Sequence, residues 1–158
     1  MFLLKGVLPS GLKELHFLNT SLDTVSEWIC PPQLEVLNLN RNKISNVSTL
    51  VLPSSLRELN LGCNTNLDFA GLVLPVNLHK LNLSFTMLEN IAMLVLPHRL
   101  VELNLSNTGI QSVSGLILPP NLEALNLSGN RILDFSPLNL SAQRNLLVLD
   151  LNLKKCGH

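Results

Sequence analysis

Histidine, cysteine and the carboxylates are the residues of this 158-residue chain that could act as metal ligands, nucleophiles or general acids and bases. Cys30, Cys63 and Cys156 form no Cys-x-x-Cys pair, so their spacing indicates neither a zinc site nor a disulfide framework. No glycine-rich phosphate loop is present, and no serine or cysteine lies in a recognised nucleophile motif. We therefore expect a protein that is not an enzyme and that has no catalytic residue, no cofactor and no metal ligand.

The chain is organised as a regular 22-residue repeat. A leucine opens each unit, and the units start at Leu12, Leu34, Leu56, Leu78, Leu100, Leu122 and Leu146. The last interval is longer than the others by a short insertion, which coincides with the loss of a recurring proline at Ser141. Further apolar positions recur in step three and five residues after each opening leucine. A period of this length predicts a stacked solenoid.

Each unit contains a Leu-x-Leu segment or a close variant, which predicts a short strand. Side chains alternate along a strand, so the outer two residues point into a core and the middle one points to solvent. Parallel stacking at about 4.8 Å would place His16 and His79, three units apart, about 14 Å from each other, too far to share a metal. Apolar residues return after the strand, as at Ile44 and Val47, and close the core from the far side. No unit has room for a long helix.

The segments 34–42 and 122–130 read L-x-x-L-x-L-x-x-N, and this pattern resembles the leucine-rich repeats. The unit length is similar to the 22-residue class of the internalin-type and phosphatase-regulator-type repeats, with a Leu-Pro added in most units. The resemblance implies an α/β-type solenoid with very little helix. Its right-handed coil would carry a parallel sheet on the concave face and short extended or 3-10 segments on the convex face. Residues 1–158 would form a single domain of about seven repeats.

The ninth position of each of the first six units carries a short polar residue. The residues there are Thr20, Asn42, Asn64, Thr86, Thr108 and Asn130. In the family that the chain resembles, this side chain points inward and satisfies backbone groups where the coil bends, which a buried bend requires. The third unit departs from the pattern, because Asn66 takes the place of an apolar residue and Leu67 follows one position late. We expect a local bulge there.

The residues between the strand leucines form a polar column on the exposed face of the sheet. They are His16, Asn38, Asn60, Asn82, Asn104, Asn126 and Asp150. Stacked amides can bond to one another, so this column is either self-satisfied structural polarity or a hydrogen-bonding platform for an extended partner. Beside it, Lys80 lies between Glu58 and Glu102, which indicates a solvated salt-bridge row. Phe85 and Arg41 are the best candidates for stronger partner contacts at this edge.

A second, apolar column precedes the recurring proline. Its members are Ile29, Val51, Val73, Val95 and Ile117. The residue before a proline prefers an extended backbone, which would turn the flanking leucines inward and these side chains outward, as a second short parallel ladder. An exposed apolar stripe of this kind usually marks an interface. The alternatives are that a neighbouring loop covers the stripe or that the segment is not a regular strand.

Composition and charge restrict the classes of partner. The chain is 46% hydrophobic and 14% charged, and Lys+Arg 11 balances Asp+Glu 11 without a run of either sign. Nucleic acid is therefore not expected as a partner, because phosphate contacts need clustered basic charge. No segment approaches the roughly 20 apolar residues that cross a bilayer, so no membrane partner is expected. The apolar start at Met1 is interrupted at Lys5, which predicts a cytoplasmic protein and leaves open export without a cleaved signal.

These observations predict a non-enzymatic protein-protein interaction module or scaffold with a protein partner. Rigid display of side chains in rows at fixed spacing would be its mechanism. One alternative is a structural, self-assembling module that forms a homo-oligomer through its strand ends or its apolar stripe. Another, which the family resemblance allows, is the substrate-recognition part of a larger effector or ligase.

Overall fold

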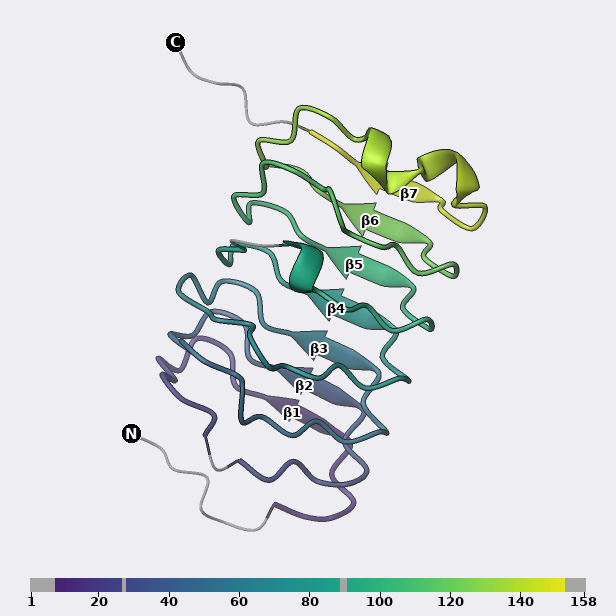
Figure 1. Ribbon diagram of the computed structural model, residues 1–158. Helices are drawn as coiled ribbons and strands as arrows, with labels where there is room; N and C mark the ends of the chain where they lie inside the picture. Colours follow the sequence, from purple (N-terminus) through teal and green to yellow (C-terminus); the bar gives the residue numbers. More distant parts are fainter. Residues whose placement is uncertain (1–7, 27, 89–90, 153–158) are drawn as a thin grey trace.

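The computed structural model describes residues 8–26, 28–88 and 91–152. Within these ranges, seven parallel strands form a single sheet in which their order follows the sequence. The strands are β1 (Glu14–His16), β2 (Val36–Asn38), β3 (Glu58–Asn60), β4 (Lys80–Asn82), β5 (Glu102–Asn104), β6 (Ala124–Asn126) and β7 (Val148–Asp150). Figure 1 shows the coils stacked on one another with their strands side by side. The predicted solenoid with a parallel sheet is confirmed.

Strand register explains why the repeat length is so regular. In β2 and β3, Leu37 pairs with Leu59, its equivalent in the next coil, and in β6 and β7 Leu125 pairs with Leu149 across the longer last unit. Because pairing keeps equivalent positions opposite each other, every inward leucine meets the leucine of the next coil. Leu37 and Leu59 are at most 1% exposed. One continuous apolar core therefore runs through the stack, as expected when no single repeat can bury its own apolar face.

The recurring Leu-Pro marks the corner through which the chain enters each strand. The N–H of Leu56 donates to the carbonyl oxygen of Pro53 at 3.1 Å, and the same bond from an opening leucine to a proline recurs in the other coils with this motif. Proline fixes its own backbone angle and so favours a rigid turn. In the last unit, Leu146 donates instead to Gln143 at 3.3 Å. The proline is thus a corner residue of the coil.

Short 3-10 turns and extended segments return the chain on the far side of the core. The 3-10 turns are η1 (Ile91–Met93), η2 (Ser136–Leu138) and η3 (Leu140–Ala142), and the described ranges contain no α-helix. The expectation of very little helix is confirmed. The predicted second parallel ladder is wrong in extent, because Ile29 and Val51 form the one bridge found along that column in the described residues. Tight turns at the start and end of each apolar triplet leave too little extended backbone for regular pairing.

Buried polar side chains hold the bend after each strand. Asn64 is 0% exposed. Its Nδ2 donates to the carbonyl oxygens of Leu61 at 2.8 Å and Leu39 at 3.1 Å, and its Oδ1 accepts the N–H of Ile44 at 3.0 Å. One amide therefore satisfies backbone groups in two adjacent coils, as a buried bend requires. The inward orientation predicted for the ninth position is confirmed here.

The predicted irregularity in the third unit is also present. An additional turn forms after Asn64, where the N–H of Leu67 donates to the carbonyl oxygen of Asn64 at 3.2 Å. This turn exposes Asn66 and buries the side chain of Leu67. The irregularity is confined to this turn. Just beyond the turn, the bridge between Asn46 and Asp68 keeps the repeat in register.

Candidate functional site

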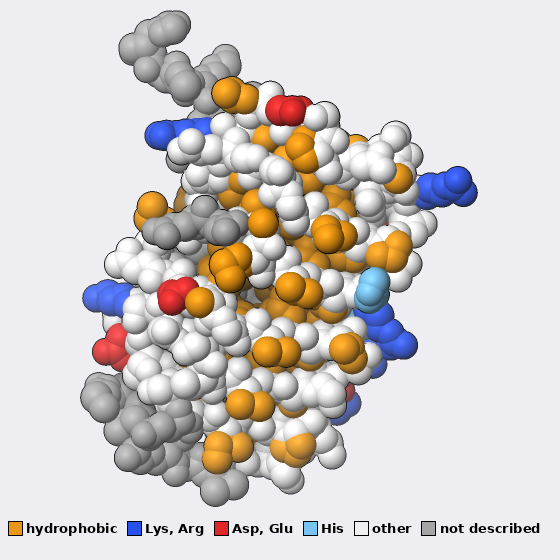
Figure 2. Space-filling view, in the orientation of Figure 1, with side chains coloured by type: hydrophobic (Ala, Val, Ile, Leu, Met, Phe, Trp, Pro, Cys, Tyr) orange, Lys and Arg blue, Asp and Glu red, His pale blue; other side chains and the backbone are white. Residues whose placement is uncertain are grey.

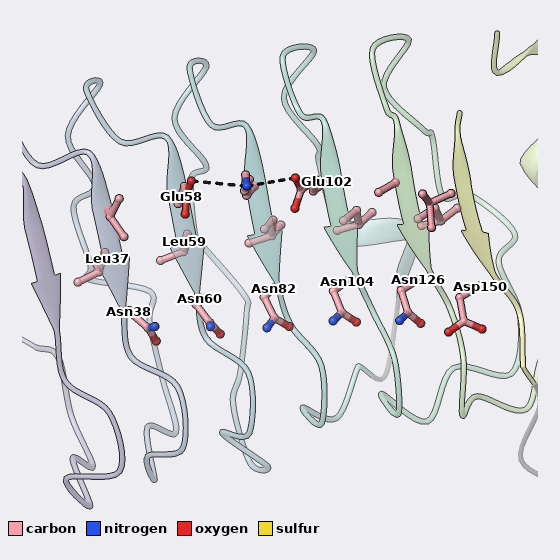
Figure 3. Close-up of a pocket in the computed structure, with 17 residues that line it drawn as sticks. Leu37, Asn38, Glu58, Leu59, Asn60, Asn82, Glu102, Asn104, Asn126 and Asp150 are labelled. Carbon is pink, nitrogen blue, oxygen red and sulfur yellow. Dashed lines mark ion pairs between the residues drawn. The ribbon is translucent and has the colours of Figure 1, made fainter. Parts of the chain in front are cut away.

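The amide row consists of the outward asparagines on the sheet: Asn38, Asn60, Asn82, Asn104 and Asn126. Each Oδ1 accepts the backbone N–H two residues later, as from Gly62 to Asn60 at 3.1 Å and from Ser84 to Asn82 at 2.9 Å. Figure 3 shows the side chains aligned across the strands. Among the described residues no hydrogen bond joins neighbouring amides of the row, and each oxygen instead accepts from its own coil. The row's Nδ2 groups have no partner among the described residues and face the groove.

Charged side chains beside the amide row form ion pairs with one another. Lys80 Nζ lies 3.1 Å from Glu102 Oε1 and 3.8 Å from Glu58 Oε1, and dashed lines that end at Glu58 and Glu102 mark these ion pairs in Figure 3. The hydrogen bond to Glu102, its charge and that of Glu58 raise the pKa of Lys80. The predicted salt-bridge row is therefore present. Because two glutamates share one lysine and Asp150 also lines this face, the sheet face keeps a net negative charge.

A shallow groove of about 470 Å³ runs over the sheet from β2 to β7. Its floor is built from the strand residues themselves, so the amide row lies along it. Side chains that line such a floor can hydrogen-bond to an extended chain laid across the strands. The described residues bring no nucleophile and base together in this groove.

The outer row consists of the apolar residues before the prolines: Ile29, Val51, Val73, Val95 and Ile117. They are 88%, 75%, 79%, 81% and 82% exposed, in that order. Figure 2 shows hydrophobic side chains as a band across successive coils on this side of the molecule. The predicted outward orientation is confirmed, and the alternative that a neighbouring loop covers the row is wrong for the described residues. Leu50 and Leu116 of the same segments are buried, so the alternation of the triplet is also as predicted.

Arg41 and Phe85 occupy a column whose backbone conformation the sequence patterns did not reveal. Both lie three residues after a strand with a left-handed backbone, at φ 56° and 55°. The same conformation recurs at the equivalent residues Asn19, Cys63, Asn107 and Gly129. Asparagine and glycine tolerate it, whereas for a bulky side chain it is strained, costing about 1–2 kcal/mol. The asparagines and the glycine in this column are the sequence feature from which the left-handed conformation could have been predicted. Phe85 is thereby held half exposed at the edge of the sheet.

Histidines and cysteines do not assemble into a chemical site. His16 contacts Glu14 at 3.3 Å, and His79 bonds to a backbone carbonyl oxygen. Burial raises the pKa of the Cys30 thiol, which makes it a poor nucleophile. In the part of the chain that the structure describes, no group of histidine, cysteine and carboxylate residues is placed to hold a metal ion, and no helix is long and apolar enough to cross a membrane. Cys156 and His158 lie outside the described residues.

Comparison with known proteins shows which family has this architecture. The family profile described as "Leucine Rich repeat" matches residues 119–134, which include β6 and the buried Asn130. The fold matches the structure of YopM from Yersinia enterocolitica WA-314 with a TM-score of 0.63 and 30% sequence identity. The chain is a leucine-rich repeat protein.

The match to YopM covers 79% of this leucine-rich repeat protein and 26% of the YopM chain. The chain therefore spans about a quarter of the length of the structure it resembles. A search of curated protein sequences found no match. The comparisons support a leucine-rich repeat module of the kind that in general binds other proteins.

Proposed function

We propose that the chain is a non-enzymatic protein-interaction module that binds through its outer row. The observation that carries this proposal is the exposure of five β-branched side chains, each at least 75% exposed, at equivalent positions of adjacent coils. Soluble proteins rarely expose a contiguous apolar patch of several hundred Å² unless it is an interface. The coils are tied together by the core and by buried asparagines, so the row is presented as a rigid strip.

A second copy of the chain is the partner that fits the outer row. The row carries no charge, and its central member is Val73, with equal numbers of similar side chains on either side. A two-fold axis through Val73 would place Val51 of one copy against Val95 of the other, so the row complements itself. Burying it on both copies removes on the order of 1,000 Å² of surface, which is at the low end for specific interfaces. We therefore expect a weak dimer that depends on protein concentration.

Solution mass across a concentration series tests this proposal. Light scattering after size-exclusion chromatography should show the wild-type chain shifting from monomer to dimer between low micromolar and millimolar concentration. The Val73→Glu, Val95→Glu double variant should remain monomeric, because pairing would bury four unpaired carboxylates. Leu133→Glu is the matched control, since Leu133 is 95% exposed and lies off the row. A wild-type protein that stays monomeric throughout would refute the second copy as partner.

A second candidate function, binding of an extended peptide segment, is favoured by the amide row. The row presents Nδ2 donors at about 4.8 Å intervals over the sheet groove. An extended peptide has backbone carbonyl oxygens that can accept them. Because the amide oxygens are fixed by their own coils, the donors are already oriented before a partner arrives. This preorganisation lowers the entropy lost on binding.

The side-chain amide signals of the asparagines give a direct test of the groove. Peptides selected from a random display library on the immobilised protein should shift the NH₂ resonances of Asn60, Asn82 and Asn104 when added to the labelled chain. Asn82→Arg should abolish these shifts, because the longer charged side chain obstructs the middle of the groove. Asn66→Arg is the control, since Asn66 is exposed away from the row. Peptides whose shifts lie on other surfaces would contradict the groove as a binding site.

A further inference from the structure

A second, smaller groove lies beside the sheet, where the chain turns into the strands of the third to fifth coils. It encloses about 290 Å³ and is lined by Glu35, Ser54, Arg57, Asn77, His79 and Arg99, among others. Figure 2 shows basic side chains gathered at one edge of the coils, on the right of the view. Neither the outer row nor the amide row contributes to this groove. It is therefore a separate feature of the molecule.

Asn77 organises the wall of this groove. Its Oδ1 accepts a hydrogen bond from Arg99 Nη1 at 3.0 Å, and its Nδ2 donates to the carbonyl oxygen of Ser54 at 2.9 Å. The carbonyl oxygen of Asn77 accepts from Nδ1 of His79, which leaves Nε2 of that ring free. One asparagine thus fixes a guanidinium and an imidazole. The remaining donors of Arg99 have no partner among the described residues.

Positive charge in the groove is compensated only in part, by one carboxylate. Neither Arg57 nor Arg99 forms an ion pair within the ranges that the structure describes. Glu35 lines the groove, but its carboxylate is 2.9 Å from Lys13 Nζ. The hydrogen bond from Lys13, the charge of Lys13 and, to a smaller extent, the charge of Arg57 lower the pKa of Glu35, so this acid is paired mainly with Lys13. The guanidinium groups of Arg57 and Arg99 therefore lie in the groove without a direct ion pair among the described residues, in a chain whose formal net charge is +0.

We propose that this groove binds a phosphate monoester carried on a protein partner, such as the side chain of a phosphoserine. Guanidinium groups bind phosphate through paired N–H donors, and a concave site with several such donors favours a group that has three acceptor oxygens over a carboxylate with two. The row of Arg57, His79 and Arg99 does not continue along the coils, because Val101 and Glu123 follow in the column of Arg57 and His79. A single cluster of this kind suits one phosphate group rather than a nucleic-acid backbone.

Titration of the ¹⁵N-labelled wild-type chain with a phosphoserine peptide, its serine counterpart and inorganic phosphate tests the site. The backbone amide signals of Arg57, His79 and Arg99 should shift and saturate with the phosphoserine peptide and should not shift with the serine peptide. Tighter binding of the peptide than of inorganic phosphate would assign the phosphate to a protein partner. Equal or tighter binding of inorganic phosphate would refute that source, and the absence of saturable shifts with either phosphate would refute the site itself.

Matched pairs of variants distinguish phosphopeptide binding in this groove from a general effect of the protein's positive charge. Arg57→Gln with Arg99→Gln should weaken phosphopeptide binding at least about tenfold, because charge-assisted donors from both guanidinium groups are lost. Arg131→Gln with Arg144→Gln removes the same charge from exposed residues elsewhere and should leave the affinity unchanged. An equal loss of phosphopeptide affinity in both pairs of variants would refute specific recognition of the phosphate by this groove. The light-scattering series is the separate test of the outer row, so either proposal can fail without the other.

Discussion

Replacing Asn64 with alanine should destabilise the protein by about 3 kcal/mol or more, because buried backbone groups left without partners cost about 1–3 kcal/mol each. The side chain is fully buried and bonds to Leu39, Ile44 and Leu61. Alanine would leave the carbonyl oxygen of Leu61 and the N–H of Ile44 without those bonds, in two adjacent coils, whereas the oxygen of Leu39 still accepts from Asn42 Nδ2 at 2.9 Å. Chemical denaturation monitored by circular dichroism would measure the difference in the free energy of unfolding.

Asn66→Ala is the control for this result, because Asn66 is an exposed asparagine two positions away in the same coil. We expect a change within about 0.5 kcal/mol, as for most surface substitutions. Asn64→Thr should fall between the two variants, since Thr86 and Thr108 occupy the equivalent position in other coils and bond to one carbonyl oxygen of their own coil. A loss below about 1 kcal/mol for Asn64→Ala would show that the inward amide does not support the bend.

Leu81→Ala should be the second strongly destabilising substitution, with a loss of about 2–5 kcal/mol. Leu81 is the inward residue of β4, is 2% exposed and packs between the leucines of the coils on either side. The alanine variant would lose the buried methyl groups and leave a cavity that the stacked coils fill only in part. Thermal and urea unfolding of the wild-type and variant chains would measure the loss.

Two further leucine variants calibrate the effect of burial. Leu149→Ala in β7 removes the same group from a side chain that is 39% exposed, so its loss should be clearly smaller than that of Leu81→Ala. Leu133→Ala should change the stability by no more than about 0.5 kcal/mol, because Leu133 is on the surface. Equal losses for Leu81→Ala and Leu133→Ala would contradict a continuous leucine core through the stack.

Most of the fold could be predicted from the sequence because the same physical requirement repeats in each coil. Leu37 and its equivalents must point inward from a strand, and the constant repeat length keeps them in register. The shifted Leu67 followed from the same comparison between units, and the inward position of Asn64 followed from the resemblance to leucine-rich repeats. Outward exposure of Val73 was also predicted, from alternation beside a proline. The absence of a regular ladder along the column of Val73 was not predicted, because it depends on how tightly the flanking turns close.

Features that depend on side-chain geometry were not predictable in the same way. The oxygen of Asn60 could bond to a neighbouring amide or to its own coil, and sequence spacing does not distinguish these two choices. The left-handed conformation at Phe85 could not be predicted from that residue, because phenylalanine rarely adopts it. Gly129 in the same column does indicate it. The basic groove is lined by Arg57, Asn77 and Arg99 from different coils and columns, so no single repeat column contains it.

Disulfide cross-linking of single-cysteine variants tests the central claim, self-association through the outer row, most directly. In a chain with Cys30→Ala, Cys63→Ser and Cys156→Ser, Val73→Cys should form a covalent dimer rapidly under mild oxidation. This follows because the proposed two-fold axis brings the two copies of residue 73 together. Leu133→Cys, which is equally accessible but off the row, should remain monomeric. Equally slow cross-linking at both positions would contradict the proposed interface.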